Sequence, residues 1–209
     1  MSRPAGDSER KLLEAAKAIL QEQGLSGLSV RAVAAKAGVN LGLVSYHFGG
    51  KEALVGQALQ EVYEDFFRDL TLQVDGEDDS LRALRAALLR LARFTRDHRR
   101  LFKSILRDLM DGNAEARKFT MDNMPRHGKV IIGLLQSCMA KGKLARHDMG
   151  VAMPLLMGAI AAPNLMVDGV IAMAPKLPFK LSARLLEKSM ISDAAQEKRV
   201  DLVLKALQP

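Results

Sequence analysis

A short segment between Ser29 and Lys51 gathers the side chains best suited to bind phosphate groups or the edges of nucleic-acid bases. Ser29 and Arg31 open an expected helix, where a hydroxyl, a guanidinium and free backbone amides can hold a phosphate. Tyr46 and His47 offer a hydroxyl and an imidazole to phosphate oxygens or to purine N7 and O6. Lys51 supplies a further cation at the start of the next expected helix. Together these residue types indicate nucleic-acid binding.

Catalytic and metal chemistry have little support in the sequence. The single cysteine, Cys138, lies in the middle of an expected helix among apolar neighbours, which favours an inert buried thiol over a nucleophile. His98, His127 and His147 form no pair at the helical spacing of metal ligands, and there is no glycine-rich phosphate loop. We therefore expect no catalytic residue, no metal and no cofactor.

The elements that must position these residues are helices. Apolar residues recur at spacings of three and four through nearly every long segment, and strict alternation is missing, so the sequence predicts an all-α fold. Helices are expected over about 7–24, 29–37, 41–48, 51–72, 80–96, 99–110, 114–140 and 148–173, followed by one or two more. The last can begin at Asp193, with Gln196 three residues on in a capping-box position.

The helices at 29–37 and 41–48 have the spacing of a helix-turn-helix motif. Ala34 is small where two crossing helices meet, and Gly38 follows four residues later, where the turn needs a positive φ. Gly42 lets the backbone of the second helix approach a duplex closely. On spacing alone, a plain helical corner that carries an alanine and a glycine is the alternative.

The run LSVRAVAAKAGVNLGLVSYHFGGKEAL, from Leu28 to Leu54, resembles the DNA-binding domain of the tetracycline-repressor (TetR) family of bacterial transcriptional regulators. The resemblance implies a homodimer whose third helices enter the major groove at the two half-sites of a palindromic operator. The candidate DNA-binding residues are Ser29, Arg31, Asn40, Leu41, Gly42, Leu43, Ser45, Tyr46, His47 and Lys51.

Three of these assignments have alternatives. Many relatives carry tyrosine where this chain has Ser45, so either Ser45 or Tyr46 is the residue that contacts phosphate. His47 could be a half-buried packing residue. Arg31 and Lys51 could be ordinary solvated charges, although their place within this motif favours phosphate contacts.

We expect two domains. Residues 1–54 form the three-helix DNA-binding domain, and the helix at 51–72 connects it to a larger helical domain over 73–209 for effector binding and dimerisation. The acidic stretch VDGEDDS, at 74–80, is the best candidate for the boundary.

An apolar effector pocket is expected in the second domain. Ten of the eleven methionines lie between Met110 and Met190, and flexible thioethers suit an adaptable pocket, although core packing explains any single one. The candidate pocket residues are Phe94, Phe102, Met121, Met124, Met157 and Asn164.

The most apolar expected helix, at 148–173, is rich in glycine and alanine, which would let a second copy approach closely in a four-helix dimer interface. A central core helix of a monomer is the alternative. Its longest apolar stretch is interrupted by Pro154, Pro163 and Asn164, so we expect no membrane span.

The overall composition excludes other classes of protein. A chain of 209 residues that is 48% hydrophobic and has one cysteine is neither disordered nor a disulfide scaffold. Its N-terminus has no apolar core of the signal-peptide type, so we expect a cytoplasmic protein.

The net charge of +7 is unevenly distributed. Residues 1–54 hold seven basic and five acidic residues, a balance of +2. Residues 55–80 hold one basic and eight acidic residues, whereas 81–107 hold nine basic and one acidic. One interpretation is that these two segments neutralise each other, which would make the helix at 51–72 a charged hinge. The other is that the basic segment binds an acidic partner, such as DNA or an anionic effector.

The sequence therefore predicts a homodimeric repressor that a small apolar or amphipathic effector releases from its operator. An activator, an architectural DNA-binding protein without a ligand, and a small-molecule binder or enzyme that reuses the fold are the alternatives.

Overall fold

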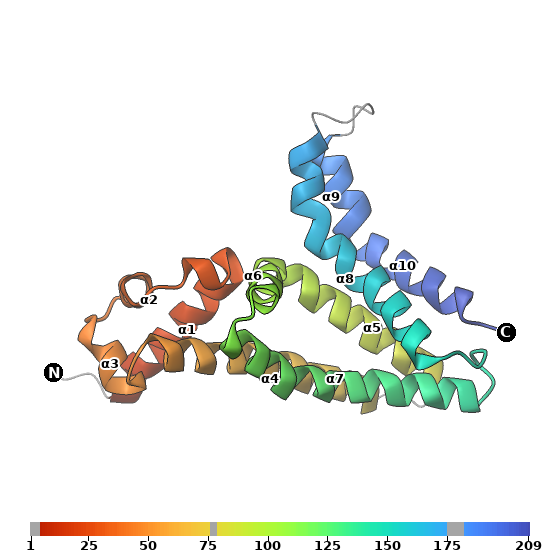
Figure 1. Ribbon diagram of the computed structural model, residues 1–209, viewed down its shortest axis with the longest axis horizontal. Helices are drawn as coiled ribbons and strands as arrows, with labels where there is room; N and C mark the ends of the chain where they lie inside the picture. Colours follow the sequence, from red (N-terminus) through yellow and green to blue (C-terminus); the bar gives the residue numbers. More distant parts are fainter. Residues whose placement is uncertain (1–4, 76–78, 175–181) are drawn as a thin grey trace. The chain divides into compact units, whose positions relative to one another are not determined.

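The computed structural model describes residues 5–75, 79–174 and 182–209, and all regular secondary structure within these ranges is helical. The elements, whose α-helices are labelled in Figure 1, are α1 (Ala5–Gln23), η1 (Leu25–Gly27), α2 (Val30–Ala37), α3 (Gly42–Phe48), α4 (Lys51–Asp75), α5 (Ser80–Asp97), α6 (Arg99–Met110), α7 (Ala114–Ala140), α8 (Met149–Met173), α9 (Ala183–Ile191) and α10 (Asp193–Ala206). The prediction of an all-α fold is confirmed, and the helix bounds lie close to the expected ones.

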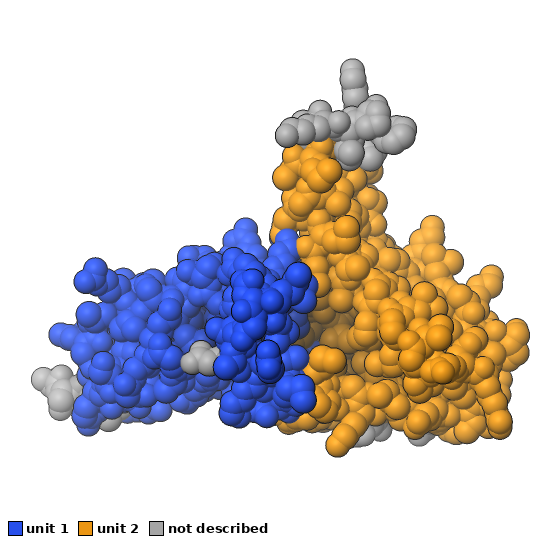
Figure 2. Space-filling model, viewed as in Figure 1, with its two compact units in different colours: residues 1–66, 98–123 blue, residues 67–97, 124–209 orange. Residues whose placement is uncertain are grey.

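The chain forms two compact units, which Figure 2 shows in different colours. Unit 1 comprises residues 1–66 and 98–123, and unit 2 comprises residues 67–97 and 124–209. Unit 1 therefore contains α6 and the start of α7 in addition to the helix-turn-helix. The expected functional boundary at residue 73 stays a prediction, and residues 76–78 of the acidic stretch at 74–80 lie outside the described residues.

Unit 1 is built on the apolar face of α1. Leu12, Ala16 and Leu20 are fully buried on that face, one turn apart. Val33 of α2 and Val44 of α3 are also fully buried, and α1 packs against both helices. This core fixes the crossing of α2 and α3, which lie at one end of the unit, with α6 at the other (Figure 1).

Helix α6 packs directly on the turn that follows α1. Gly24 has φ 74° and ψ −169°, a conformation essentially restricted to glycine. A Cβ placed there would lie 2.5 Å from Ser104 Oγ and 2.8 Å from the carbonyl oxygen of Arg100, both on α6. The Arg100 guanidinium also donates to the carbonyl of Glu22. Glycine is therefore required at position 24 both by its backbone conformation and by the close contact with α6.

Polar contacts join α1 and α7 to α4 in the same unit. Lys17 of α1 lies 3.5 Å from Glu61 and 3.6 Å from Asp65 of α4. Burial opposes the charge of Lys17, but these carboxylates and Glu14 raise its pKa. The hydroxyl of Tyr63, on α4, donates to the carbonyl of Asn123 at 2.6 Å.

Unit 2 is built around α5, α8 and α10, with α9 packed on α8 and α10. Pro163 lacks the amide that would donate to the carbonyl of Ala159 four residues earlier in α8. Arg199 Nε, on α10, donates to that carbonyl at 3.2 Å. Asn164 is fully buried, and its Nδ2 donates to the carbonyls of Ala92 on α5 and Ile160 on α8, at 3.0 Å each. Side chains thus satisfy the backbone where the proline interrupts α8.

Two sequence-based expectations about unit 2 are wrong. Helix α10 begins at Asp193 as expected, but its N-cap is Ser192, whose Oγ accepts from the amide of Ala195 at 3.2 Å, so the expected capping-box role of Gln196 is wrong. Gln196 instead turns inward, is 1% exposed, and donates to the carbonyl of Ile191 at 3.1 Å. Burial of this face of α10 outweighs the local capping pattern.

The second wrong expectation is that the acidic segment 55–80 and the basic segment 81–107 neutralise each other. One pair joins them as expected, Arg90 with Asp69 at 2.5 Å. Three other arginines of α5 pair with α10 instead, namely Arg85 with Asp201 at 2.6 Å, Arg93 with Glu197 at 3.3 Å, and Arg96 with Asp193 at 2.6 Å. For these three the expected neutralisation by the acidic segment is wrong, because α10 packs along the same flank of α5.

Substitution of Gly24 tests the close approach of α6. Gly24→Ala should lower the free energy of unfolding by about 2 kcal/mol or more, because it combines backbone strain with a steric clash. Gly112, which has φ 77° and nothing within 4 Å of a Cβ, is the control. Gly112→Ala should cost only the backbone term, about 1 kcal/mol. Equal losses in urea unfolding would contradict the packing on α6.

Candidate nucleic-acid interface

Hydrogen bonds at both ends of α2 set the geometry of the helix-turn-helix. Ser29 is the N-cap of α2, and its Oγ accepts from the amide of Ala32 at 3.1 Å. Gly38 ends α2 in the left-handed conformation, with φ 65°. Asn40 Oδ1 then accepts from the amide of Gly42, the first residue of α3, at 2.8 Å. The turn expected at Gly38 is confirmed.

Helix α3 turns one side to the core and the other to solvent. Val44 is fully buried between α1 and α2, whereas Tyr46 is 75% exposed and Leu41 is 45% exposed. The exposed Tyr46 and Leu41 offer apolar contact surface to a partner. The other outward positions are the exposed Gly42 and Ser45 and the half-buried Leu43.

His47 connects α3 to α1. Its Nε2 lies 2.8 Å from the Oγ of Ser8, which is 8% exposed near the start of α1. The ring of Tyr46 meets the His47 ring edge to face, with centroids 4.9 Å apart. His47 therefore holds α3 in place, and contact with DNA stays a prediction for it. Ser8 is absent from the sequence-based set because no local pattern relates residues 39 positions apart.

Two cations flank the outward face of α3 in the sequence. Arg31 and Lys51 are exposed, and neither has an ion-pair partner among the residues that the structure describes. Lys36, on the same motif, is instead paired with Glu22 of α1 at 3.0 Å. Free cations keep their full attraction for phosphate, so Arg31 and Lys51 suit a polyanion better than Lys36 does.

Most of the sequence-based DNA set is thus accessible. Eight of the ten candidates are exposed, namely Ser29, Arg31, Asn40, Leu41, Gly42, Ser45, Tyr46 and Lys51. Leu43 and His47 are half-buried. The arrangement presents hydroxyl, amide and cationic groups around one short exposed helix, which is the geometry needed to enter a major groove.

This N-terminal region matches a known family. Residues 12–58, from α1 to the second turn of α4, match the model described as bacterial regulatory proteins of the tetR family. Residues 12–58 of the chain therefore belong to the TetR family. The resemblance based on residues 28–54 is confirmed by this match, which extends it to the apolar face of α1.

Curated relatives of this chain are transcriptional regulators by name. It is 31% identical over 103 residues to the Bacillus subtilis protein named "Probable HTH-type transcriptional regulator YttP", which covers 47% of this chain and 49% of that protein. It is 32% identical over 81 residues to HTH-type transcriptional regulator BetI 2 of Chromohalobacter salexigens, covering 38% and 39%. The chain spans about half or less of the length of these curated relatives.

Solved structures share the whole fold. The crystal structure of the transcriptional regulator FadR from Bacillus subtilis in complex with stearoyl-CoA has a TM-score of 0.69 at 15% identity, covering 95% of this chain and 99% of that one. The TetR-family transcriptional regulator PfmR from Thermus thermophilus has a TM-score of 0.60 at 18% identity, with the same coverage. Likeness at such low identity establishes the fold.

The six candidate effector-pocket residues have different surroundings. Phe102 and Met121 belong to unit 1, and the other four belong to unit 2. Met121 and Met124 are 68% and 60% exposed, whereas Phe94 is buried and Met157 is half-buried. The amide of Asn164 is engaged by the backbone of α5 and α8, as described above. The role of these six residues in an effector pocket stays a prediction.

The thiol of Cys138 lies in the interior of unit 2. Burial raises the pKa of the Cys138 thiol, which is fully buried in α7, and this disfavours the thiolate. Among the described residues, no three His, Cys, Asp or Glu side chains are grouped as metal ligands would be.

Removal of the Ser8 hydroxyl tests the link between α1 and α3. Ser8→Ala should lower the free energy of unfolding by about 1 kcal/mol and speed amide hydrogen exchange in α3, because the half-buried His47 loses its partner. Ser8→Thr should restore most of the loss. Ser26→Ala is the control, since Ser26 is an exposed serine of the same unit. Unchanged exchange in α3 with Ser8→Ala would show that the bond does not hold the helix.

Proposed function

We propose that this protein is a sequence-specific DNA-binding transcriptional regulator in which α3 enters the major groove. The observation that carries the proposal is the exposed face of α3, with Tyr46 at 75% exposure, on a helix-turn-helix that belongs to the TetR family. The named curated relatives are transcriptional regulators, which supports the same function. Half-buried His47 and buried Val44 keep the reading face at a fixed orientation.

Affinity and specificity come from different residues in this proposal. The free cations of Arg31 and Lys51, with the hydroxyl of Ser29, contact phosphates and set the position of the domain on the duplex. Tyr46 and its outward neighbours on α3 contact base edges. A net charge of only +2 over residues 1–54 gives little non-specific attraction, so a dimer on two half-sites is needed for useful affinity.

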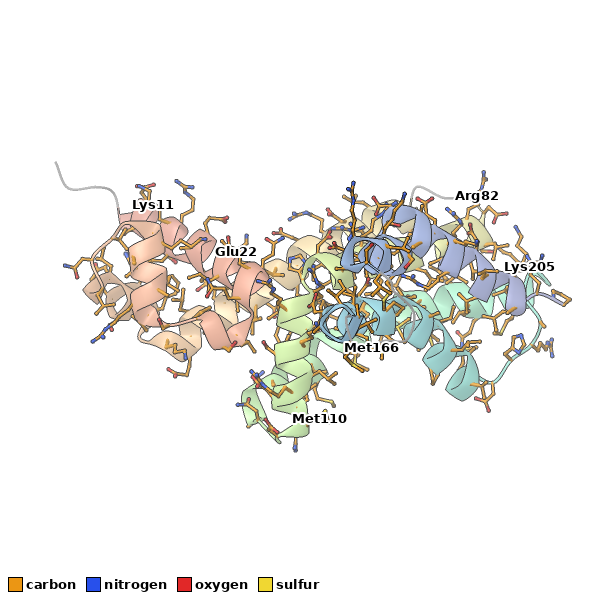
Figure 3. The ribbon with its side chains drawn as sticks, turned by 90° about the horizontal axis from the view of Figure 1, so that it is seen from above. Lys11, Glu22, Arg82, Met110, Met166 and Lys205 are labelled. Atoms are coloured by element: carbon orange, nitrogen blue, oxygen red, sulfur yellow. The ribbon has the colours of Figure 1, made fainter. Side chains whose placement is uncertain are left out.

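The dimer interface is proposed to be one face of α8. Four large apolar side chains of this helix are exposed at spacings that place them on one stripe, namely Val151 (67%), Leu155 (47%), Met166 (59%) and Met173 (58%). Gly158 lies on the same stripe, and nothing lies within 4 Å of a Cβ placed there. Met166 is labelled on α8 in Figure 3. A second copy would bury this surface at a twofold axis.

A membrane is a poorer partner for this helix. α8 is long and apolar enough to span one by length and composition, and only 22% of its most apolar window is buried within the chain. However, Pro154, Pro163, Asn164 and Asp168 interrupt it, and its other face packs against α5 and α10. These features fit a cytoplasmic dimer better than a span.

The regulatory signal is proposed to be a small apolar or amphipathic effector that releases a repressor from a palindromic operator. The solved FadR structure, which shares the fold, is a complex with stearoyl-CoA, and this supports effector binding in the same architecture. Release requires an effector that binds one dimer geometry more tightly than the other, by about 1 to 3 kcal/mol.

DNA contacts can be tested after selection of a preferred duplex from random sequences. Lys51→Ala should weaken binding to all duplexes and reduce the slope of log K against log salt by about one. Tyr46→Ala should also alter the selected sequence, because it removes a base contact. Lys36→Ala is the matched control, because Lys36 is already paired with Glu22. If Lys51→Ala and Tyr46→Ala bind as tightly as the parent, α3 is not the reading helix.

A bulky charge on the α8 stripe tests the dimer. Gly158→Arg should raise the dimer dissociation constant by about tenfold or more, roughly 1.4 kcal/mol, measured by sedimentation. Gly133→Arg is the control, because Gly133 is an equally open helical glycine on α7. A dimer that both variants leave intact would exclude this face of α8.

A further inference from the structure

A small cavity lies within unit 1, next to the helix-turn-helix, and none of the six candidate effector residues is in its lining. Its volume is about 240 Å³, and its walls come from η1, the first turns of α4, the end of α6 and the start of α7. The close packing of α6 on the turn at Gly24 brings these elements together. The cavity thus touches the helix that begins with the proposed phosphate contact Lys51.

The inner wall of the cavity is apolar. Leu59 of α4 and Ile105 of α6 line it and are 7% and 8% exposed. Val55 and the ring of Phe119, both half-buried, complete this wall. Such a surface would accept a ring or a short branched chain, whose burial contributes about 25 cal/mol per Å² of apolar area.

The rim carries charges of both signs. Arg107 lies 3.6 Å from Asp108, so these two largely offset each other. Lys51 and Glu52 also line the cavity, and neither has an ion-pair partner among the described residues. The free ammonium of Lys51 and the free carboxylate of Glu52 therefore line the same cavity. Together they match a ligand that carries both charges, whereas a singly charged ligand would leave one of them unmatched.

The volume limits the size of the occupant. Pockets for drug-sized ligands usually measure about 300 to 1,000 Å³. A cavity of about 240 Å³ suits a smaller molecule and is too small to enclose a long acyl thioester. The apolar wall, the paired free charges and the small volume together define one chemical class.

We propose that this cavity binds a small zwitterion with an apolar side chain, of the size of a free α-amino acid. The ligand carboxylate faces Lys51, its ammonium faces Glu52, and its side chain enters between Leu59 and Ile105. The occupied cavity would be a second ligand site, distinct from an effector pocket in unit 2.

The site has a direct consequence for DNA binding. A ligand carboxylate that engages Lys51 competes with DNA phosphate for the same ammonium. Ligand and DNA should therefore weaken each other's binding by equal factors, as linkage requires. This consequence rests on the proposed function, whereas binding of the ligand itself does not.

Three probes with one ring and different head groups test the chemical class on the full chain. L-Phenylalanine is a zwitterion, 3-phenylpropanoate an anion and 2-phenylethylamine a cation. L-Phenylalanine should bind with a Kd on the order of 1 mM and shift the amide resonances of η1, α6 and the start of α7. Each singly charged probe should bind about two- to fivefold more weakly. No binding by L-phenylalanine, shifts confined to unit 2, or equal affinity for all three probes would overturn the proposal.

Substitutions at the cavity distinguish recognition of the ligand's head-group charges from a change in the overall charge of unit 1. Glu52→Gln should reduce the affinity for L-phenylalanine to that for 3-phenylpropanoate, because the ammonium has lost its partner. Glu9→Gln, which changes an acid of unit 1 away from the cavity, should leave the ranking of the probes unchanged. Val55→Trp should fill the cavity and abolish binding of all three, with folding checked by circular dichroism. An unchanged ranking in Glu52→Gln would contradict the assigned head-group contact.

The link to DNA is measured separately by titrating the selected duplex with and without saturating L-phenylalanine. The parent should lose DNA affinity by the same factor by which DNA weakens L-phenylalanine. In Lys51→Ala this coupling should vanish. If L-phenylalanine does not change the DNA affinity of the parent, ligand and DNA do not compete for Lys51. Binding of L-phenylalanine to the cavity would then still hold. Failure of the chain to bind any duplex would instead count against the proposed function.

Discussion

In unit 1, α6 approaches the turn after α1 closely, and much of the unit depends on this contact. Gly24 leaves no room for a side chain, so the backbones of the turn and of α6 meet directly. Ser104 and Arg100 provide the opposing surface, and the Arg100 guanidinium closes the end of α1. Because interiors are close-packed, a displacement of α6 must move the turn, and with it the first helix of the DNA-binding motif.

Two contacts on the inner side of α3 fix the orientation of its outward face. Val44 is buried between α1 and α2, and His47 is joined to Ser8 of α1. Both contacts fix the position of α3 relative to α1. The end of α1 is in turn packed against α6. A rigid support of this kind suits a short reading helix, because a few side chains discriminate bases only when their positions are fixed. Through α1, a movement of α6 would also be transmitted to the proposed reading face of α3.

Helix α8 shows how one helix meets two opposite requirements. Its inner side carries Asn164 and the carbonyl left free by Pro163, and both find partners on α5 and α10. Burial lowers the pKa of Arg199, the residue that supplies one of these partners. Its outer side is an apolar stripe with an open glycine, Gly158. The Asn164 amide and the Ala159 carbonyl are satisfied inside and apolar groups lie outside, an arrangement that is stable when a second copy covers the stripe.

Local sequence determined the helices, their caps at Ser29 and Gly38, and the exposed face of α3, because these depend on residues within one or two turns of each other. The sequence alone did not show that Ser8 meets His47, that α6 packs on Gly24, or that the arginines of α5 pair with α10. It also gave no sign of the cavity beside Lys51, whose walls come from four separate segments. These features join residues far apart in the chain, and only the packing of whole helices decides which of many possible partners become neighbours.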